Sequence, residues 1–402
     1  MQESPRDETR RPPFSLFEKI DLCRGLFAAL VVIAHAFDLA RAVDPGWDAG
    51  MPTLAADFLL CGIGTGVYYV MGFFILSGYC IHESARRLTV DGRFPLRAYL
   101  IARATRILPL YYAALLFAVA VEAAAGATGR RPPFWPMGLD LSALAGQVVL
   151  AQGVLQSFGA FAASWSITNE AAYYLLFGLI AAACVPLRAR PAVVGLAICT
   201  AGGLALQLAY RATRDPVAMR AGMLVGLGAV WHLGALVADY APRLAATGRI
   251  AGLARAWPAA LAATMALHIS RRSYQEFVFV AAGVSFAMML VHFVVRDGEA
   301  RASGSPPPDA PRRLPVELGL ASYPIYLFHG PLLIAFGTAV GACGPAPPWW
   351  AVWPSAALFA LGGCLPLGRL LERPLLAWRS GVMERVAARE RGRTPDPLAV
   401  GS

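Results

Sequence analysis

The sequence predicts an all-α protein, a polytopic bundle of about ten transmembrane helices, and three observations support this class. The 402 residues are 57% hydrophobic and only 15% charged, whereas a soluble chain uses about 25% charged residues to cover its surface. The apolar residues form blocks of about 20, long enough to cross a hydrocarbon core of roughly 30 Å. The arginines lie mostly in short loops beside these blocks, which is typical of cytoplasmic loops.

Ten of the apolar blocks are candidate spans, and an eleventh is ambiguous. The ten are residues 20–40, 57–81, 99–122, 165–187, 191–210, 217–238, 256–270, 275–295, 316–340 and 349–371. The eleventh, 142–160, contains Gln147, Gln152 and Gln156. It could therefore cross the membrane or enter and leave on the same side.

The charge of the loops favours entry and exit on one side. If 142–160 does not cross and the N-terminus is inside, most arginines of the second half lie inside: Arg188, Arg190, Arg243, Arg249, Arg255, Arg296, Arg301, Arg312, Arg313 and those of 373–393. The arginines that then lie outside are Arg211, Arg214, Arg220, Arg271 and Arg272. A crossing would reverse this balance. We therefore expect ten spans, both termini cytoplasmic, and an extracytoplasmic, re-entrant loop 123–164.

Three segments flank or interrupt the expected transmembrane domain, residues 16–378. Residues 1–15 are a polar cytoplasmic N-terminus, and Arg24 within the first apolar block indicates an uncleaved helix and not a signal peptide. Residues 297–314 are rich in Ser, Gly and Pro and are expected to be a flexible cytoplasmic linker. Residues 379–402 are expected to be a basic cytoplasmic tail, with one helix on the membrane surface and a disordered end from about 394.

Composition excludes two classes of site. The net charge of +10 belongs to the loops and forms no basic stripe interleaved with aromatic residues, so we expect no nucleic-acid partner. The seven cysteines include no CxxC motif and no Cys/His cluster, so we expect no metal site. The partner that the composition does indicate is the lipid bilayer.

Charged side chains inside the spans are candidates for functional residues, because each costs at least about 2.5–3.5 kcal/mol at the membrane centre. Arg24 and His35 are eleven residues apart, which is about 20° past three full turns, so they share one helix face roughly 16 Å apart. They could be a snorkelling arginine and a packed histidine. A shared face towards the bundle interior instead favours a functional pair, because histidine suits proton transfer near neutral pH.

Three further clusters lie in or at the spans. Arg103 and Arg106 share a face, and their planar donors suit phosphate or carboxylate, although arginines that only flank a span would look the same. Glu170 follows Ser166 by one turn and could be a first-turn acid beside a helix cap or a buried carboxylate that serves or orients a base. The span 316–340 contains Tyr326 and His329, which favour a polar pocket and packing at a helix kink equally.

Together these motifs resemble the acyltransferase-3 family of bacterial membrane O-acyltransferases, the type that acetylates O-antigens and exopolysaccharides. The resemblance covers the chain from about Ile20 to Pro374. It rests on motifs in family order: Arg24 with His35, Phe73 to Tyr79, Arg103 with Arg106, Trp165 to Tyr174, Ser322 to Pro331, and Glu372 to Pro374.

The resemblance implies an enzyme of the bacterial inner membrane that takes an acyl group, usually acetyl, from cytoplasmic acetyl-CoA as a co-substrate. The acceptor would be a hydroxyl of an extracytoplasmic or membrane-associated glycan, glycolipid or glycoside, and no cofactor would be bound permanently. His35 would be catalytic, as base or acyl carrier, with Glu170 orienting or charging it. The expected donor-binding residues are Arg24, Arg103 and Arg106, and the expected substrate-binding residues are Ser166, Tyr326 and His329.

The chain departs from the family pattern at two places. Cys23 replaces the small glycine that is usual in the family's Asp-Gly-Leu-Arg opening, and Met71-Gly72, ahead of Phe73, replaces a pair partner that is frequently acidic. Both changes bear on packing or acceptor shape and not on a catalytic group. A glycan or glycolipid transporter without acyl chemistry is the alternative, because it too would keep ionisable groups inside a bundle, and a binding subunit without turnover is a third class.

Overall fold

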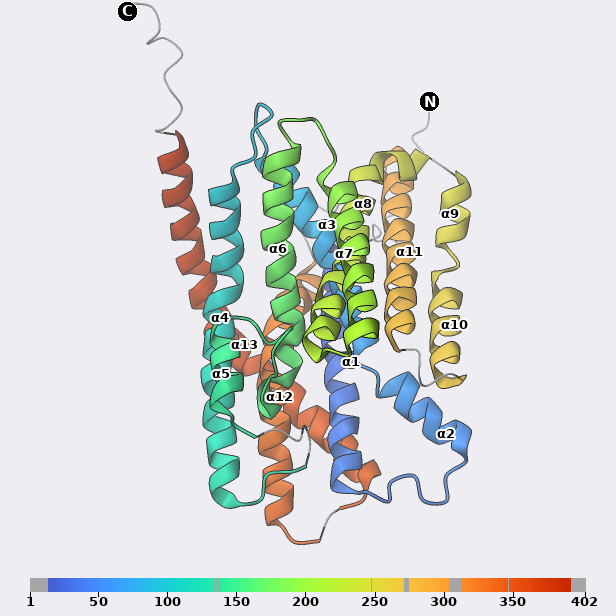
Figure 1. Cartoon of the computed structure of the whole chain (residues 1–402), viewed down its shortest axis with the longest axis vertical. Coiled ribbons are helices and arrows are strands. Elements are labelled where there is room, and N and C mark those ends of the chain that lie inside the picture. Colours follow the sequence, from blue (N-terminus) through green and yellow to red (C-terminus); the bar gives the residue numbers. More distant parts are fainter. Residues whose placement is uncertain are drawn as a thin grey trace, which may run out of the picture.

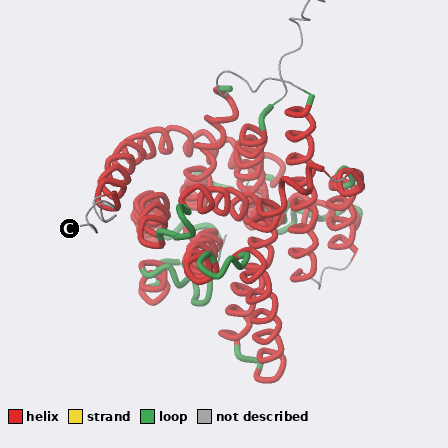
Figure 2. Tube along the Cα trace, turned by 90° about the horizontal axis from the view of Figure 1, so that it is seen from above, coloured by secondary structure: helices red, strands yellow, loops and turns green. Residues whose placement is uncertain are grey.

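The computed structural model describes residues 14–133, 135, 138–246, 248–270, 275–303, 312–345 and 347–391. Over these residues the chain is all-α, as predicted, with no β-strand (Figures 1 and 2). In chain order the helices are α1 (Leu16–Val43), α2 (Thr53–Asp57), the π-helix η1 (Phe58–Ile63), α3 (Val67–Leu88), α4 (Leu96–Thr128), α5 (Leu141–Val148), the 3-10 helix η2 (Gly159–Ser164), α6 (Trp165–Cys184), α7 (Pro191–Thr213), α8 (Pro216–Ala246), α9 (Gly248–Ala254), α10 (Trp257–Ser270), α11 (Gln275–Ala302), α12 (Arg313–Ala342) and α13 (Trp349–Arg391).

Nine helical segments among the described residues are long and apolar enough to cross a membrane, so the chain is a multi-pass membrane protein. The tenth expected span, 256–270, is α10, whose 14 residues are about 21 Å long and fall short of a core of roughly 30 Å. The helix is interrupted at Arg255 and Ala256, and α9 lies above α10 in one column of Figure 1. The expected count of ten therefore included α10, which is too short to cross by itself.

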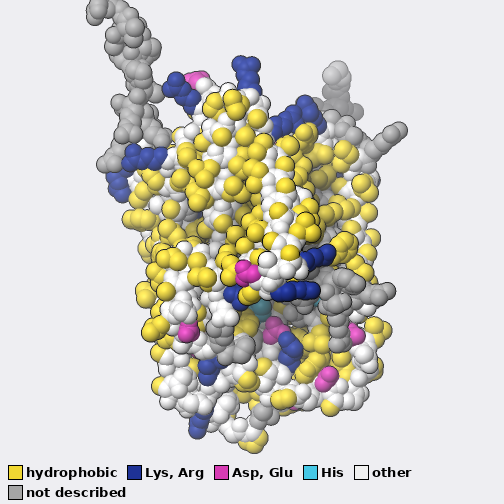
Figure 3. Space-filling model, in the orientation of Figure 1, with side chains coloured by type: hydrophobic (Ala, Val, Ile, Leu, Met, Phe, Trp, Pro, Cys, Tyr) yellow, Lys and Arg dark blue, Asp and Glu magenta, His cyan; other side chains and the backbone are white. Residues whose placement is uncertain are grey.

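Apolar side chains cover most of the upper half of the face in Figure 3, and charged side chains are more frequent in the lower half. A belt of apolar side chains suits contact with lipid tails. The position of each terminus relative to the membrane stays a prediction, and residues 1–13 and 392–402 lie outside the described residues.

The start of α1 is tied to the helices that follow it in space. Ser15 and Glu18 form a capping box, in which Glu18 N donates to Ser15 Oγ (3.3 Å) and Ser15 N donates to Glu18 Oε2 (2.8 Å). The other oxygen of Glu18 accepts from Arg312 N (2.8 Å), and Asp297 Oδ1 accepts from Leu16 N (3.1 Å). Asp297 belongs to α11 and Arg312 precedes α12, so this cap holds three helix ends together.

The helices α3 and α8 approach closely because glycines face each other's backbone. A Cβ at Gly78 would lie 2.0 Å from Trp231 O, and a Cβ at Gly234 would lie 2.0 Å from Ile75 O. Small residues at such contacts let membrane helices pack through their backbones. This contact brings Trp231 of α8 against the face of α3 that carries Ser77, where Trp231 Nε1 donates to Ser77 Oγ (3.2 Å).

The ambiguous segment 142–160 forms no helix long enough to cross. The eight residues of α5 are followed by irregular backbone up to η2. Tyr111 and Tyr112, in the middle of α4, donate to the carbonyls of Gln147 (2.8 Å) and Val148 (2.9 Å), the last two residues of α5, so α4 supplies partners for carbonyls at the end of this short helix. The side of the membrane on which this loop lies stays a prediction.

Two other expected segments are partly helical. The linker was expected at 297–314, but α11 continues to Ala302 and α12 begins at Arg313, so both ends of this range are helical. Residues 304–311 lie outside the described residues. The tail from 379 continues α13, a single helix of 43 residues up to Arg391.

Candidate active site

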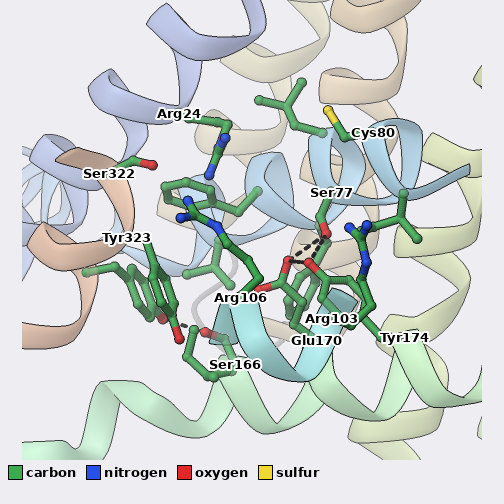
Figure 4. A pocket seen from close by; sticks show the side chains of 17 residues that line it. Arg24, Ser77, Cys80, Arg103, Arg106, Ser166, Glu170, Tyr174, Ser322 and Tyr323 are labelled. Carbon is green, nitrogen blue, oxygen red and sulfur yellow. Dashed lines mark hydrogen bonds between the residues drawn. The ribbon is translucent and has the colours of Figure 1, made fainter. Parts of the chain in front are cut away.

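A pocket between α1, α3, α4, α6 and α12 collects most of the predicted site residues (Figure 4). It encloses about 840 Å³, part of it open to the outside. The predicted residues that line it are Arg24, Arg103, Arg106, Ser166, Glu170 and Tyr326. The spacing of motifs along the chain therefore identified side chains that four helices bring together.

Arg24 and Arg106 each have an acidic partner. Arg24 Nη1 lies 3.5 Å from Asp21 Oδ1 on the same helix, and Arg106 Nη1 lies 2.8 Å from Glu372 Oε1 of α13. The Arg106 side chain is 24% exposed and that of Glu372 is 9% exposed, so this pair is only partly removed from solvent. Each carboxylate holds its guanidinium at the pocket wall and cancels part of its charge.

Arg103 is held by neutral groups. Its Nη2 donates to Ser84 Oγ (3.1 Å), and its guanidinium lies 5.6 Å from the centre of the Tyr99 ring. A serine hydroxyl and an aromatic face position the guanidinium without neutralising it. The charge of Arg103 is therefore less compensated by these contacts than that of Arg24 or Arg106, and it can attract an anionic ligand more strongly.

In Figure 4, Glu170 lies between the side chains of Arg106 and Arg103. Its Oε1 accepts from Ser77 Oγ and from Tyr174 Oη, both at 2.5 Å. These short bonds to an anionic acceptor are the strong kind. Glu170 was expected to orient or charge His35, but the partners that the structure gives it are Ser77 and Tyr174 inside the arginine pocket.

Tyr326 of α12 lines the pocket. Its hydroxyl donates to Ala163 O (2.9 Å), so the 2.6 Å bond to Ser166 must use the serine hydroxyl as donor. The Tyr326 ring is 5.8 Å from the ring of His329. Tyr326 therefore stands between the pocket and the histidine.

His35 lies beyond Tyr326 and pairs with Asp38. Its Nδ1 is 3.3 Å from Asp38 Oδ2, and Asp38 Oδ1 accepts from Arg41 Nε (3.0 Å) and Nη2 (2.9 Å). The His329 ring stacks on the His35 ring at 5.4 Å and 7°. With Nδ1–H directed at the carboxylate, Nε2 of His35 has a free lone pair, and a Cβ at Gly66 would be 3.7 Å from it.

The sequence patterns did not single out Asp38, although its spacing of three residues after His35 places both on one helix face. His329 is fully buried, and its Nδ1 lies 3.2 Å from Ile325 O. In the neutral ring that nitrogen carries the proton, so Nε2 is an acceptor. Nε2 has no hydrogen-bond partner among the described residues.

A second ion pair supports the loop beside His35. Arg131 binds Glu122 of α4 through Nε (2.7 Å) and Nη2 (3.0 Å), and Nη2 also donates to Trp135 O (2.8 Å). Glu122 Oε1 accepts in turn from Ala160 N (2.7 Å). Trp135 lies edge-on to His35, with 5.0 Å between the ring centres. No sequence pattern indicated this pair, because it joins the end of one helix to a loop without a motif.

The described residues contain no group of three or more metal-binding side chains. No curated protein and no solved structure matches the chain. A family model described as an acyltransferase domain matches residues 17–369, a range that includes both the arginine pocket and the His35–Asp38 pair. The chain therefore belongs to the acyltransferase-3 family and is a membrane acyltransferase.

Proposed function

We propose that the protein transfers an acyl group, usually acetyl, from cytoplasmic acyl-CoA to a hydroxyl of an extracytoplasmic or membrane-associated glycan, glycolipid or glycoside, in the inner membrane of a bacterium. The observation that supports this best is the succession of neighbouring groups from the arginine pocket to His35. Arg24, Arg103 and Arg106 meet in one pocket, Tyr326 follows, and the His35–Asp38 pair lies behind it.

The arginine pocket suits the phosphates of CoA. Guanidinium groups match phosphate oxygens in geometry and charge. The contacts that hold Arg103 come from neutral groups, the Ser84 hydroxyl and the Tyr99 ring. A diphosphate among the arginines would let the pantetheine arm extend past Ser166 and Tyr326 towards His35. Ser166 and Tyr326 would then bind the arm, and His329 would accept a hydrogen bond from a hydroxyl or an amide of a substrate.

His35 supplies the chemistry in this proposal. Its Nε2 takes the proton of the acceptor hydroxyl while the hydroxyl oxygen attacks the thioester carbon. The C–S bond breaks, and the CoA thiolate takes the proton back from His35, so that protons and electrons balance. Asp38 keeps Nε2 available and stabilises the imidazolium, as the acid of a catalytic triad does. The alternative in which Nε2 itself carries the acyl group uses the same geometry.

Glu170 has a supporting role in this scheme. Through Ser77 and Tyr174 it fixes the wall of the donor pocket, and its negative charge sets the local balance of charge around the arginines. Loss of Glu170 should therefore weaken donor binding more than it alters the reactivity of His35.

The test is transfer by the purified full-length protein from labelled acetyl-CoA to envelope extract of the source cells, followed as label on the acceptor and as free CoA thiol. We expect His35→Ala to lower the rate by about 10²–10⁴-fold. His292→Ala, a half-buried histidine of α11, is the matched control and should keep the rate. Transport of an intact glycan across vesicles without modification would support the carrier instead, and label transfer that persists in His35→Ala would refute the catalytic assignment.

A further inference from the structure

Arg379 of α13 lies next to the arginine pocket without lining it. It borders a narrow crevice together with Arg106, Glu372 and Tyr323, and both Arg106 and Tyr323 also line the pocket. The Nε atom of Arg379 is buried and has no hydrogen-bond partner among the described residues. A guanidinium group with an unused donor therefore stands at the edge of the donor pocket.

Arg379 continues the row of arginines in one direction. Glu372, which binds Arg106, is seven residues before Arg379, so the two share one face of α13 and are about 10 Å apart along its axis. The direction from Glu372 to Arg379 leads to the C-terminal end of the helix, the end expected to be cytoplasmic. Arg379 therefore extends the row of arginines towards the end of α13 that is expected to be cytoplasmic.

The charges of the pocket and its partners cancel. The positive groups are Arg24, Arg103 and Arg106, and the negative groups are Asp21, Glu170 and Glu372. A phosphomonoester carries about −1.5 to −2 at neutral pH, and the diphosphate of CoA adds to this. A ligand with so much negative charge needs a cationic group beyond this balance, and Arg379 is in position to supply it.

We propose that Arg379 binds the 3′-phosphate of the acyl-CoA donor. This inference rests on the proposed function, because it takes acyl-CoA as the donor. In extended CoA the thiol and the 3′-phosphate lie at opposite ends, with the diphosphate between them. With the thioester at His35 and the diphosphate among the arginines of the pocket, the 3′-phosphate is the group that arrives outermost, at the mouth of the crevice between Arg106 and Arg379.

Binding of CoA and of 3′-dephospho-CoA to the purified full-length protein, measured by isothermal titration calorimetry, tests this without knowledge of the acceptor. We expect the wild type to bind CoA about ten-fold or more tightly than 3′-dephospho-CoA. Arg379→Ala should lose that preference by weakening only CoA. Arg385→Ala removes a charge from an exposed position of the same helix and should keep the preference.

Equal weakening of both ligands by Arg379→Ala would overturn the proposal, because it would assign Arg379 a structural role. A wild type that binds both ligands equally tightly would also overturn it and would leave the proposed acyl transfer intact. A wild type that binds neither ligand would overturn both. A thermal unfolding midpoint for each variant, with Arg379→Lys as the charge-preserving form, separates misfolding from loss of the phosphate contact.

Discussion

Asp38 lies one turn after His35 on α1, and its Oδ2 is 3.3 Å from the imidazole Nδ1. Arg41, one turn further along, binds the other carboxylate oxygen. A single helix therefore carries the base, the acid that orients it and the cation that fixes the acid. This order needs no contact with another helix, so the three groups stay aligned when the surrounding helices move.

Asp38→Asn should reduce turnover and leave donor binding unchanged. The amide can present an N–H to Nδ1, which would favour the tautomer whose Nε2 carries the proton. We expect kcat to fall by about 10²–10⁴-fold and KM for acetyl-CoA to change little, which initial rates at varied donor concentration would measure. Asp48→Asn, in an exposed loop, should behave like wild type. An unchanged kcat for Asp38→Asn would remove Asp38 from the mechanism.

The Arg106–Glu372 pair should show two separable effects. Arg106→Gln leaves the carboxylate of Glu372 nearly buried and alone, which costs about 3–5 kcal/mol for a fully buried pair and less here because Arg106 is 24% exposed. Adding Glu372→Gln should restore most of the thermal stability but not the affinity for CoA. Recovery of CoA affinity in the double variant would mean that Arg106 serves the fold alone.

Tyr326→Phe and Ser166→Ala should differ in their effect on stability. Loss of the tyrosine hydroxyl leaves both Ala163 O and the Ser166 hydroxyl without their partner, at a cost of about 1–3 kcal/mol. Loss of the serine hydroxyl leaves the Tyr326 bond to Ala163 in place, so it should cost less. Thermal unfolding of the two variants measures the difference, and a reversed order would contradict the assignment of donor and acceptor.

Much of the fold followed from the sequence, because a membrane span is a local property of about 20 residues. The arginine pair in α4 and the faces of α1 were predicted for the same reason, since the helical repeat alone fixes which residues share a face. The exception is α10, because residues 256–270 are apolar enough to be read as a span although its 14 residues are too few to cross the membrane.

Contacts between helices were beyond the reach of these patterns. Arg106 and Glu372 are 266 residues apart, and no periodicity states which helix faces which. Glu170 also has its partner, Ser77, on another helix. The helical repeat of a single span therefore could not predict whether Glu170 faces Ser77 or His35. The spacing of three residues between His35 and Asp38 is visible in the sequence. It did not distinguish Asp38, because acidic residues are common near the end of a span.

Gly78→Ala should disturb the site from a distance. Its methyl group would lie 2.0 Å from Trp231 O, so α3 and α8 would have to separate, at a cost of about 1–3 kcal/mol. The Trp231 bond to Ser77, and with it the wall at Glu170, would shift. Gly362→Ala is the control, because nothing lies within 4 Å of the added methyl. Equal thermal stability and CoA affinity of the two variants would contradict this.

Arg131→Met should expose His35 by releasing the loop that covers it. The Glu122 side chain is fully buried and Arg131 is 16% exposed, so breaking the pair costs about 3–5 kcal/mol and removes the bond to Trp135 O. His35 should then react faster with diethyl pyrocarbonate, as mass spectrometry would show, while His292 in the same sample reacts at its former rate. The double variant Glu122→Gln with Arg131→Gln would remove the unpaired charge and recover stability. It would not restore the bidentate contact through which Arg131 fixes the loop. If His35 in that double variant reacts as slowly as in wild type, the pair stabilises the fold and does not shield the histidine.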